Sequence, residues 1–97
     1  MTTETAVLEK TDIIIAENYK MVLHNDNITS MEFVILLLMS VFKKDDQEAI
    51  VLTMKVHNDG SAVIAEYSSY EVAEQKLHEA NELIFAYGYP LKITIEQ

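Results

Sequence analysis

The chain has 97 residues, of which 49% are hydrophobic and 24% charged, proportions that suit one globular domain with one hydrophobic core. Seven lysines stand against 16 Asp and Glu, and the formal net charge of -9 has the wrong sign for binding nucleic-acid phosphates or anionic lipid. There is no cysteine, so neither a disulfide nor a thiolate zinc site can form. We expect a cytoplasmic protein with no nucleic-acid partner and no membrane partner.

Residues 1–18 mix Thr, Glu and Lys with one short Ile-Ile-Ile cluster, and no helical or strand period persists through them. We interpret 1–18 as a flexible N-terminal extension and 19–97 as the core domain. The extension is either a frayed terminus or an arm that contacts a partner. Its acidic, Arg-free composition does not match a signal or transit peptide.

The core domain opens with alternating apolar and polar residues over 19–24, which predicts a half-buried strand that ends at an Asn-Asp-Asn turn. Thr29 and Glu32 then have the spacing of a capping box, with Thr29 as the cap of a helix that begins at about Ser30. This helix is apolar on several faces, so we expect it to be buried on more than one side.

A second helix should follow the first across a sharp corner. The lysine pair and the acidic run at 43–48 match the end of one helix and the N-cap of the next. The second helix should end near His57, because the Asn-Asp-Gly sequence at 58–60 is a strong turn signal.

The last three predicted elements are a strand, a helix and a strand. Residues 61–67 have strand composition, and the Ser-Ser-Tyr-Glu sequence at 68–71 repeats the capping spacing, with its first Ser at the cap position. An amphipathic helix follows and should stop at Gly88, before a closing strand over 91–96. The order β-α-α-β-α-β predicts an α+β, two-layer domain in which helices cover a small antiparallel sheet.

The sequence gives little support to an enzyme. It has no cysteine, no glycine-rich phosphate loop and no recognisable acid/base pair of carboxylates. His24, His57 and His78 lack the spacing of a helical zinc site, so we expect no metal and no cofactor. From spacing alone, His57 is simply a residue at a helix end and the Asn-Asp-Asn turn a local one.

A family resemblance adds to this reading. The stretch Tyr19 to Val34 (YKMVLHNDNITSMEFV) resembles the signature of the ClpS adaptor family, which is a strand, Asn-Asp-Asp, an apolar residue and Thr-Pro-Met-Glu-Phe-Val. Further matches follow in order: VHNDG at 56–60, EVAEQK at 71–76 and YPLK at 89–92. The resemblance implies a three-stranded antiparallel sheet with three helices, similar to the C-terminal domain of the ribosomal stalk protein.

The resemblance also implies a function. A ClpS-type protein is a bacterial, non-enzymatic adaptor that binds the free α-amino group and the bulky first side chain (Leu, Phe, Tyr or Trp) of N-degron substrates. It binds the N-terminal domain of a Clp ATPase of the ClpA or ClpC type and delivers the substrate for degradation by the ClpP protease. The alternative is a structural or ribosome-associated module that shares the fold. A hydrolase built on His57 and Asp26 would need a nucleophile that the sequence does not offer.

Site residues follow from the resemblance and from the chemistry of an ammonium group, which has three donors and needs fixed acceptors. The expected amine-binding residues are Asn25, Asp26, Asn27 and His57. By resemblance the hydrophobic pocket is lined by Leu23, Thr29, Met31, Val34, Thr53, Val56 and Leu91. Glu71 and Lys76 match positions that the family uses to dock on the ATPase.

Three departures from the family pattern fall in or beside this site. Ser30 replaces a proline, Asn27 replaces the second Asp of the turn, and Thr53 stands where the family often has Met. A Thr is shorter than a Met, so we expect Thr53 to leave more room beside the β-carbon of a bound residue and to make the pocket more permissive.

Overall fold

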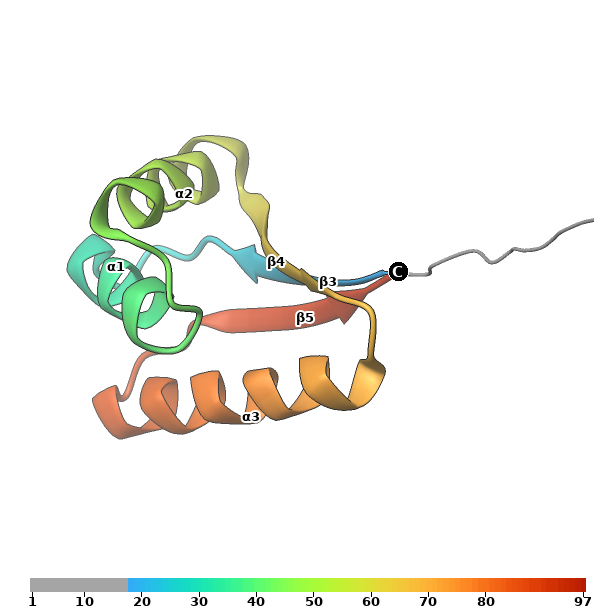
Figure 1. Ribbon diagram of the computed structural model, residues 1–97. Coiled ribbons are helices and arrows are strands. Elements are labelled where there is room, and N and C mark those ends of the chain that lie inside the picture. Colours follow the sequence, from blue (N-terminus) through green and yellow to red (C-terminus); the bar gives the residue numbers. More distant parts are fainter. Residues whose placement is uncertain (1–17) are drawn as a thin grey trace, which may run out of the picture.

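The structure is a computed structural model and describes residues 18–97. The predicted N-terminal extension lies outside the described residues except for Asn18, whose side-chain amide donates to Glu66 at 3.0 Å. The elements are β3 (Tyr19–His24), α1 (Met31–Ser40), α2 (Asp46–Asp59), β4 (Ser61–Tyr67), α3 (Tyr70–Tyr87) and β5 (Lys92–Glu96) (Figure 1). This is the β-α-α-β-α-β order expected from the sequence.

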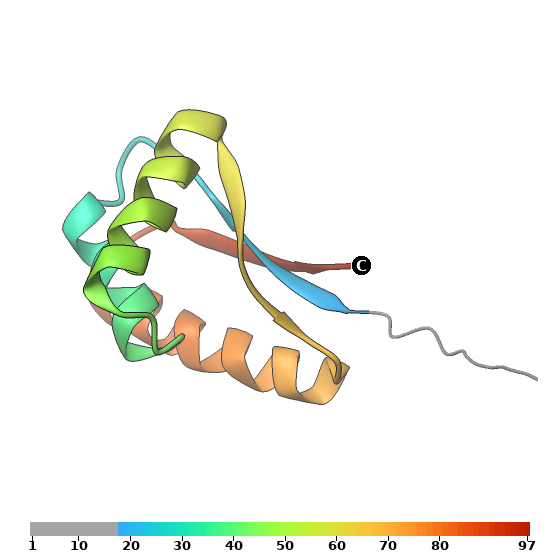
Figure 2. The same cartoon turned by 45° about the horizontal axis from the view of Figure 1, so that its top comes forward.

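Within residues 18–97 the strands form a three-stranded antiparallel sheet in the order β4-β3-β5. Figures 1 and 2 show α3 lying along one face of the sheet, with α1 and α2 packed together at one end. Met21 and Leu23 of the central strand are fully buried in the core. The two-layer α+β prediction is confirmed.

The register of the central strand places opposite charges in facing positions. Lys20 lies opposite Glu66 of β4 and opposite Glu96 of β5. Opposite charges in facing positions stabilise a strand pair, and a slip by one residue would expose the core side chains of β3.

The N-caps of α1 and α3 each lie one residue after the predicted position. Ser30 caps α1 and accepts from the Phe33 amide at 3.1 Å, while the hydroxyl of Thr29 donates to Asp26 instead. At α3 the cap is Ser69, which accepts from the Val72 amide at 3.3 Å. The prediction of Thr29 as cap was wrong because spacing alone cannot show that Asp26 binds Thr29 first.

The corner between α1 and α2 follows the predicted capping. Asp45 accepts from the Glu48 amide at 2.8 Å and caps α2, as expected. Lys43, whose φ is 60°, donates from its ammonium group to the Ser40 carbonyl at 3.0 Å, where positive charge stabilises the end of α1.

Helix α2 runs to Asp59, two residues beyond the predicted end at His57. Gly60 ends it in a left-handed conformation with φ of 90°, and its amide donates to the Val56 carbonyl at 2.9 Å. The Asn-Asp-Gly sequence therefore located the glycine that ends the helix correctly, but the predicted last helical residue was two positions too early. Among the described residues, no helix has the length and apolar character needed to cross a membrane.

Candidate functional site

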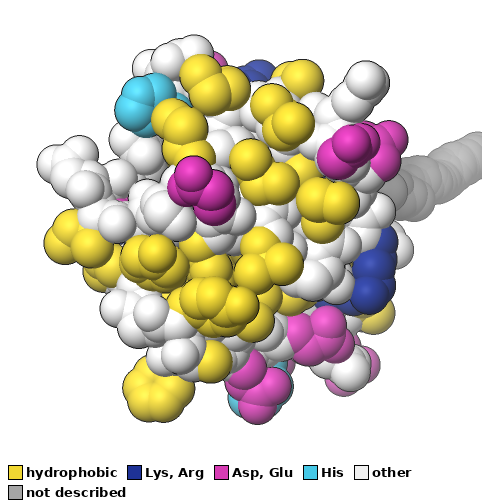
Figure 3. Space-filling view, turned by 90° about the vertical axis from the view of Figure 1, so that its left-hand side faces the viewer, with side chains coloured by type: hydrophobic (Ala, Val, Ile, Leu, Met, Phe, Trp, Pro, Cys, Tyr) yellow, Lys and Arg dark blue, Asp and Glu magenta, His cyan; other side chains and the backbone are white. Residues whose placement is uncertain are grey.

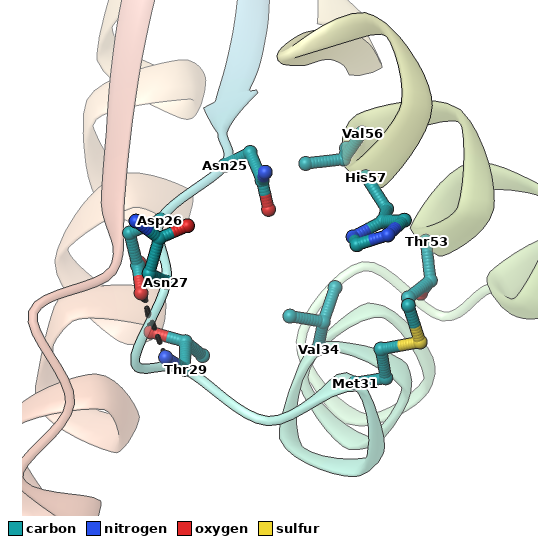
Figure 4. Close-up of a pocket in the computed structure, with 9 residues that line it drawn as sticks. All are labelled: Asn25, Asp26, Asn27, Thr29, Met31, Val34, Thr53, Val56 and His57. Atoms are coloured by element: carbon teal, nitrogen blue, oxygen red, sulfur yellow. Dashed lines mark hydrogen bonds between the residues drawn. The ribbon is translucent and has the colours of Figure 1, made fainter.

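A cavity of about 240 Å³ opens between the loop after β3, the start of α1 and the end of α2 (Figure 4). Its lining residues are Asn25, Asp26, Asn27, Thr29, Met31, Val34, Thr53, Val56 and His57. The volume is below the roughly 300–1,000 Å³ of sites for drug-sized ligands. It suits a single large side chain.

The lining contains every residue expected to bind an amine, and most of those expected in the hydrophobic pocket. Leu23 and Leu91 are the exceptions, since both lie in the hydrophobic core outside the lining. Leu23 is fully buried on the side of β3 that faces the helices. Resemblance to a family assigns residues by their position in the sequence and does not show which buried side chains border a cavity.

Asn25 and His57 form a polar pair across the cavity. The backbone N–H of Asn25 donates to the backbone carbonyl of Gly60 at 2.9 Å, and this bond connects the loop to the end of α2. Figure 4 shows the side chains of Asn25 and His57 directed into the same space from opposite elements. Within the described part of the chain neither side chain hydrogen-bonds to protein, so the Asn25 oxygen and a ring nitrogen of His57 can serve a ligand.

Asp26 organises the loop between β3 and α1. One carboxylate oxygen accepts from the Ile28 amide at 2.8 Å and the Thr29 amide at 2.7 Å, and the other accepts from the Thr29 hydroxyl at 2.8 Å. Burial raises the pKa of the Asp26 carboxyl, but these three hydrogen bonds together outweigh burial and hold the pKa below its usual 3.8. Asp26 is therefore a fixed negative charge bound by its own loop.

The apolar side of the cavity comes from both helices, with Met31 and Val34 from α1 and Thr53 and Val56 from α2. The hydroxyl of Thr53 donates to the Ala49 carbonyl at 2.7 Å, a bond inside α2. Figure 4 shows the thioether of Met31 extending toward Thr53. Because the hydroxyls of Thr29 and Thr53 are both bound to protein, this side of the cavity is largely hydrocarbon.

An aromatic cluster that the sequence analysis missed supports the start of α1. The ring of Phe33 lies 4.9 Å, centroid to centroid, from both Tyr87 and Tyr89. The Tyr89 hydroxyl donates to the Ser30 hydroxyl oxygen at 3.2 Å and so links the cap of α1 to the segment before β5. The sequence signal was the Tyr-Gly-Tyr sequence at 87–89, two aromatic residues on either side of the glycine that ends α3.

The two predicted docking residues lie on α3, outside the cavity. Glu71 is exposed in the first turn of the helix. The ammonium group of Lys76 donates to the Val41 carbonyl at 3.2 Å and lies 3.5 Å from a carboxylate oxygen of Glu79. Lys76 thus also connects α3 to the end of α1.

The chain is similar in sequence to known proteins of one family. The family model described as "ATP-dependent Clp protease adaptor protein ClpS" matches residues 15–94. The ClpS adapter of Nautilia profundicola is 40% identical over 97 residues, which cover 100% of this chain and 99% of that protein. The ClpS adapter of Clostridium acetobutylicum is 43% identical over 77 residues, which cover 79% of this chain and 75% of that protein.

A solved structure gives the same result. Agrobacterium tumefaciens ClpS2 bound to L-phenylalaninamide superposes with a TM-score of 0.78 at 35% identity, and the match covers 84% of this chain and 98% of that chain. A family match over most of the sequence and a shared fold lead to one conclusion: the chain belongs to the ClpS family of ATP-dependent Clp protease adaptor proteins.

Proposed function

We propose that this chain binds the free α-amino group and the bulky hydrophobic first side chain of N-degron substrates, and delivers them to a Clp ATPase of the ClpA or ClpC type for degradation by ClpP. The observation that carries the proposal is the cavity itself. One side of it brings Asn25 and His57 together, and the other side is largely hydrocarbon. A structural module would have no need for acceptors beside an open apolar cavity.

An α-ammonium group fits the polar side of the cavity. The Asn25 side-chain oxygen and the neutral imidazole of His57 would each accept one of its protons, and the amide oxygen of Asn27 offers a third acceptor. The bound carboxylate of Asp26 adds negative charge beside them. Such an arrangement favours a charged amine over a neutral amide.

The first side chain of the substrate would fill the apolar part between α1 and α2. Leu, Phe, Tyr and Trp are the side chains expected there, and a cavity of about 240 Å³ is large enough for one of them. The bound L-phenylalaninamide of the Agrobacterium relative, which carries a free amine and a benzyl side chain, supports the same chemistry here.

The test compares peptides that begin with Leu or Phe and carry either a free or an acetylated N-terminus, measured by fluorescence anisotropy. We expect micromolar binding of the free peptides, on the order of 8 kcal/mol. Acetylation should weaken binding at least tenfold, because each charged hydrogen bond lost costs about 1.5 to 3 kcal/mol. His57→Ala should weaken the free peptides only. Equal affinity for free and acetylated peptides would contradict the proposal.

A further inference from the structure

Exposed and partly exposed apolar side chains form rows on α1 and α2, the two helices that border the cavity. We call these rows the helix strip; its members are Met31, Ile35 and Met39 on α1 and Ile50 and Met54 on α2. Met31 is 38% exposed, Met39 40%, Ile50 48% and Met54 41%. Figure 3 shows hydrophobic side chains gathered on the face formed by this end of the molecule.

Helical spacing gives the strip its direction. Met31, Ile35 and Met39 follow one another at steps of four residues, and so do Ile50 and Met54, so each set forms one row along its helix. The cavity joins the start of α1 to the end of α2, through Met31 and Thr53. The row on α1 therefore starts at the cavity with Met31, and the row on α2 starts at Met54, next in sequence to the lining residue Thr53.

The length of the strip matches a short piece of extended chain. Met31 to Met39 spans eight residues of helix, or about 12 Å at about 1.5 Å per residue. An extended peptide rises about 3.3 Å per residue, so the strip can accompany three to four residues. Three of its five members are methionines, whose flexible thioethers adapt to side chains of different shape.

We propose that the helix strip receives the side chains of residues two to four of a bound substrate and favours apolar residues at those positions. This inference rests on the proposed function, because the strip is aligned with a substrate only when the first residue fills the cavity. The strip is continuous with the cavity through Met31, which is both a lining residue and a member of the strip.

The experiment measures binding by isothermal titration calorimetry for three ligands: the peptides Phe-Leu-Val-Leu-Lys and Phe-Ser-Ser-Ser-Lys, and L-phenylalaninamide, which lacks residues two to four. The proteins are the wild type, Met39→Ser, Ile50→Ser and the control Val51→Ser. Val51 is 65% exposed, more than the strip residues, and lies one position further round α2 than Ile50. Melting curves show whether each variant remains folded.

The wild type should bind the apolar peptide about tenfold more tightly than the serine peptide, since partial burial of two or three side chains suffices for that factor. Met39→Ser and Ile50→Ser should each reduce this preference roughly threefold or more, whereas Val51→Ser should leave it intact. Binding of L-phenylalaninamide should be the same in all four proteins. The three substituted residues lie outside the cavity lining, so a change in the binding of L-phenylalaninamide would indicate that the variant is misfolded.

Equal binding of the two peptides to the wild type, or a preference that survives in both strip variants, would overturn the proposal. Sedimentation of the wild type tests the other occupant: a dimer that Met39→Ser dissociates, with no change in peptide preference, would assign the strip to a second copy of the chain. Failure of the proposed function looks different, because neither L-phenylalaninamide nor either peptide would then bind.

Discussion

At Thr53 the hydroxyl donates to the Ala49 carbonyl, so the polar end of the side chain is already bound inside α2. Thr53 is 4% exposed and lines the cavity, and it contributes hydrocarbon there. The hydroxyl is therefore not free to weaken the binding of apolar ligands. What remains is the difference in size between Thr and Met.

Thr53→Met should sharpen the preference for Leu over Ile as the first residue of a peptide. The longer side chain would occupy space beside the β-carbon of the bound residue, where Ile is branched, and such steric differences are worth roughly tenfold or more in a hydrophobic pocket. Anisotropy titrations with peptides beginning Leu, Phe, Ile and Val measure the effect. Thr53→Val is the matched control and should leave the Leu to Ile ratio unchanged. An unchanged ratio in Thr53→Met would mean that position 53 does not limit ligand shape.

Asp26 has a second, measurable consequence through its titration. A carboxyl whose pKa is lower in the folded state stabilises the fold above its unfolded pKa, and the contribution disappears as the pH falls through the folded pKa. The pKa of Asp26 lies below 3.8 in the fold, with the Ile28 and Thr29 donors as the cause that outweighs burial. Its stabilising contribution is therefore complete near neutral pH and lost in strong acid.

Asp26→Asn tests this directly by urea denaturation at a series of pH values. The Asn side chain keeps an oxygen for the two amides but carries no charge. The wild type should be more stable than the variant at pH 7, and the difference should shrink as the pH falls from about 5 to below 3. A difference that stays constant over that range would show that the charge of Asp26 contributes nothing to the loop.

At the scale of single elements, the sequence predicted the type and the order of the helices and strands, but it misplaced two of the helix N-caps. Hydrophobic spacing located each of the described helices and strands, because burial of one face imposes a period of 3.6 or 2 residues. The caps of α1 and α3 each lie one residue later than the capping-box spacing predicts. At α1 the Asp26 carboxylate binds the Thr29 hydroxyl and leaves Ser30 to cap the helix.

Helix α3 offers a test that separates docking from stability. Lys76→Met removes the bond to the Val41 carbonyl and should lower the free energy of unfolding by about 1 kcal/mol. Glu71→Gln, on an exposed turn, should change it by less than about 0.5 kcal/mol. Both effects are measured by urea denaturation.

The same two variants are then titrated against the N-terminal domain of a Clp ATPase. If α3 is the docking surface, Glu71→Gln should weaken this binding without loss of stability. Binding that is unaffected in Glu71→Gln and reduced only in proportion to the instability of Lys76→Met would remove both residues from the docking surface.

At the scale of the whole molecule, the site could be predicted only in part. Spacing alone indicates only that His57 lies at a helix end and that Met31 is a core residue. Family resemblance predicted that the two belong to one site, and in the structure both line the same cavity. Resemblance also grouped Leu23 and Leu91 with them, but both lie in the hydrophobic core outside the cavity lining. Contacts between elements far apart in sequence are not encoded in local periodicity.

The net charge of -9 leads to a prediction about rates. A negative protein attracts a cationic N-terminus over distances comparable with the Debye length, which is about 10 Å at 0.1 M salt and shorter at higher salt. Raising the salt concentration should therefore slow the association of a free-amine peptide several-fold and change its dissociation less. Stopped-flow anisotropy measures both rates. If salt changed only the dissociation rate, the charge of the protein would act on the bound peptide through contacts within the site and not on its approach.

The position of β3 in the sheet has a consequence for how the protein is made. Tyr19–His24 comes first among the described strands, yet it lies in the centre, and its two neighbours β4 and β5 both come later in the chain. During synthesis β3 must therefore wait beside β4 with one edge unpaired until β5 has been made and has emerged from the ribosome. Until then the exposed edge of β3 is a surface that chaperones can protect from aggregation.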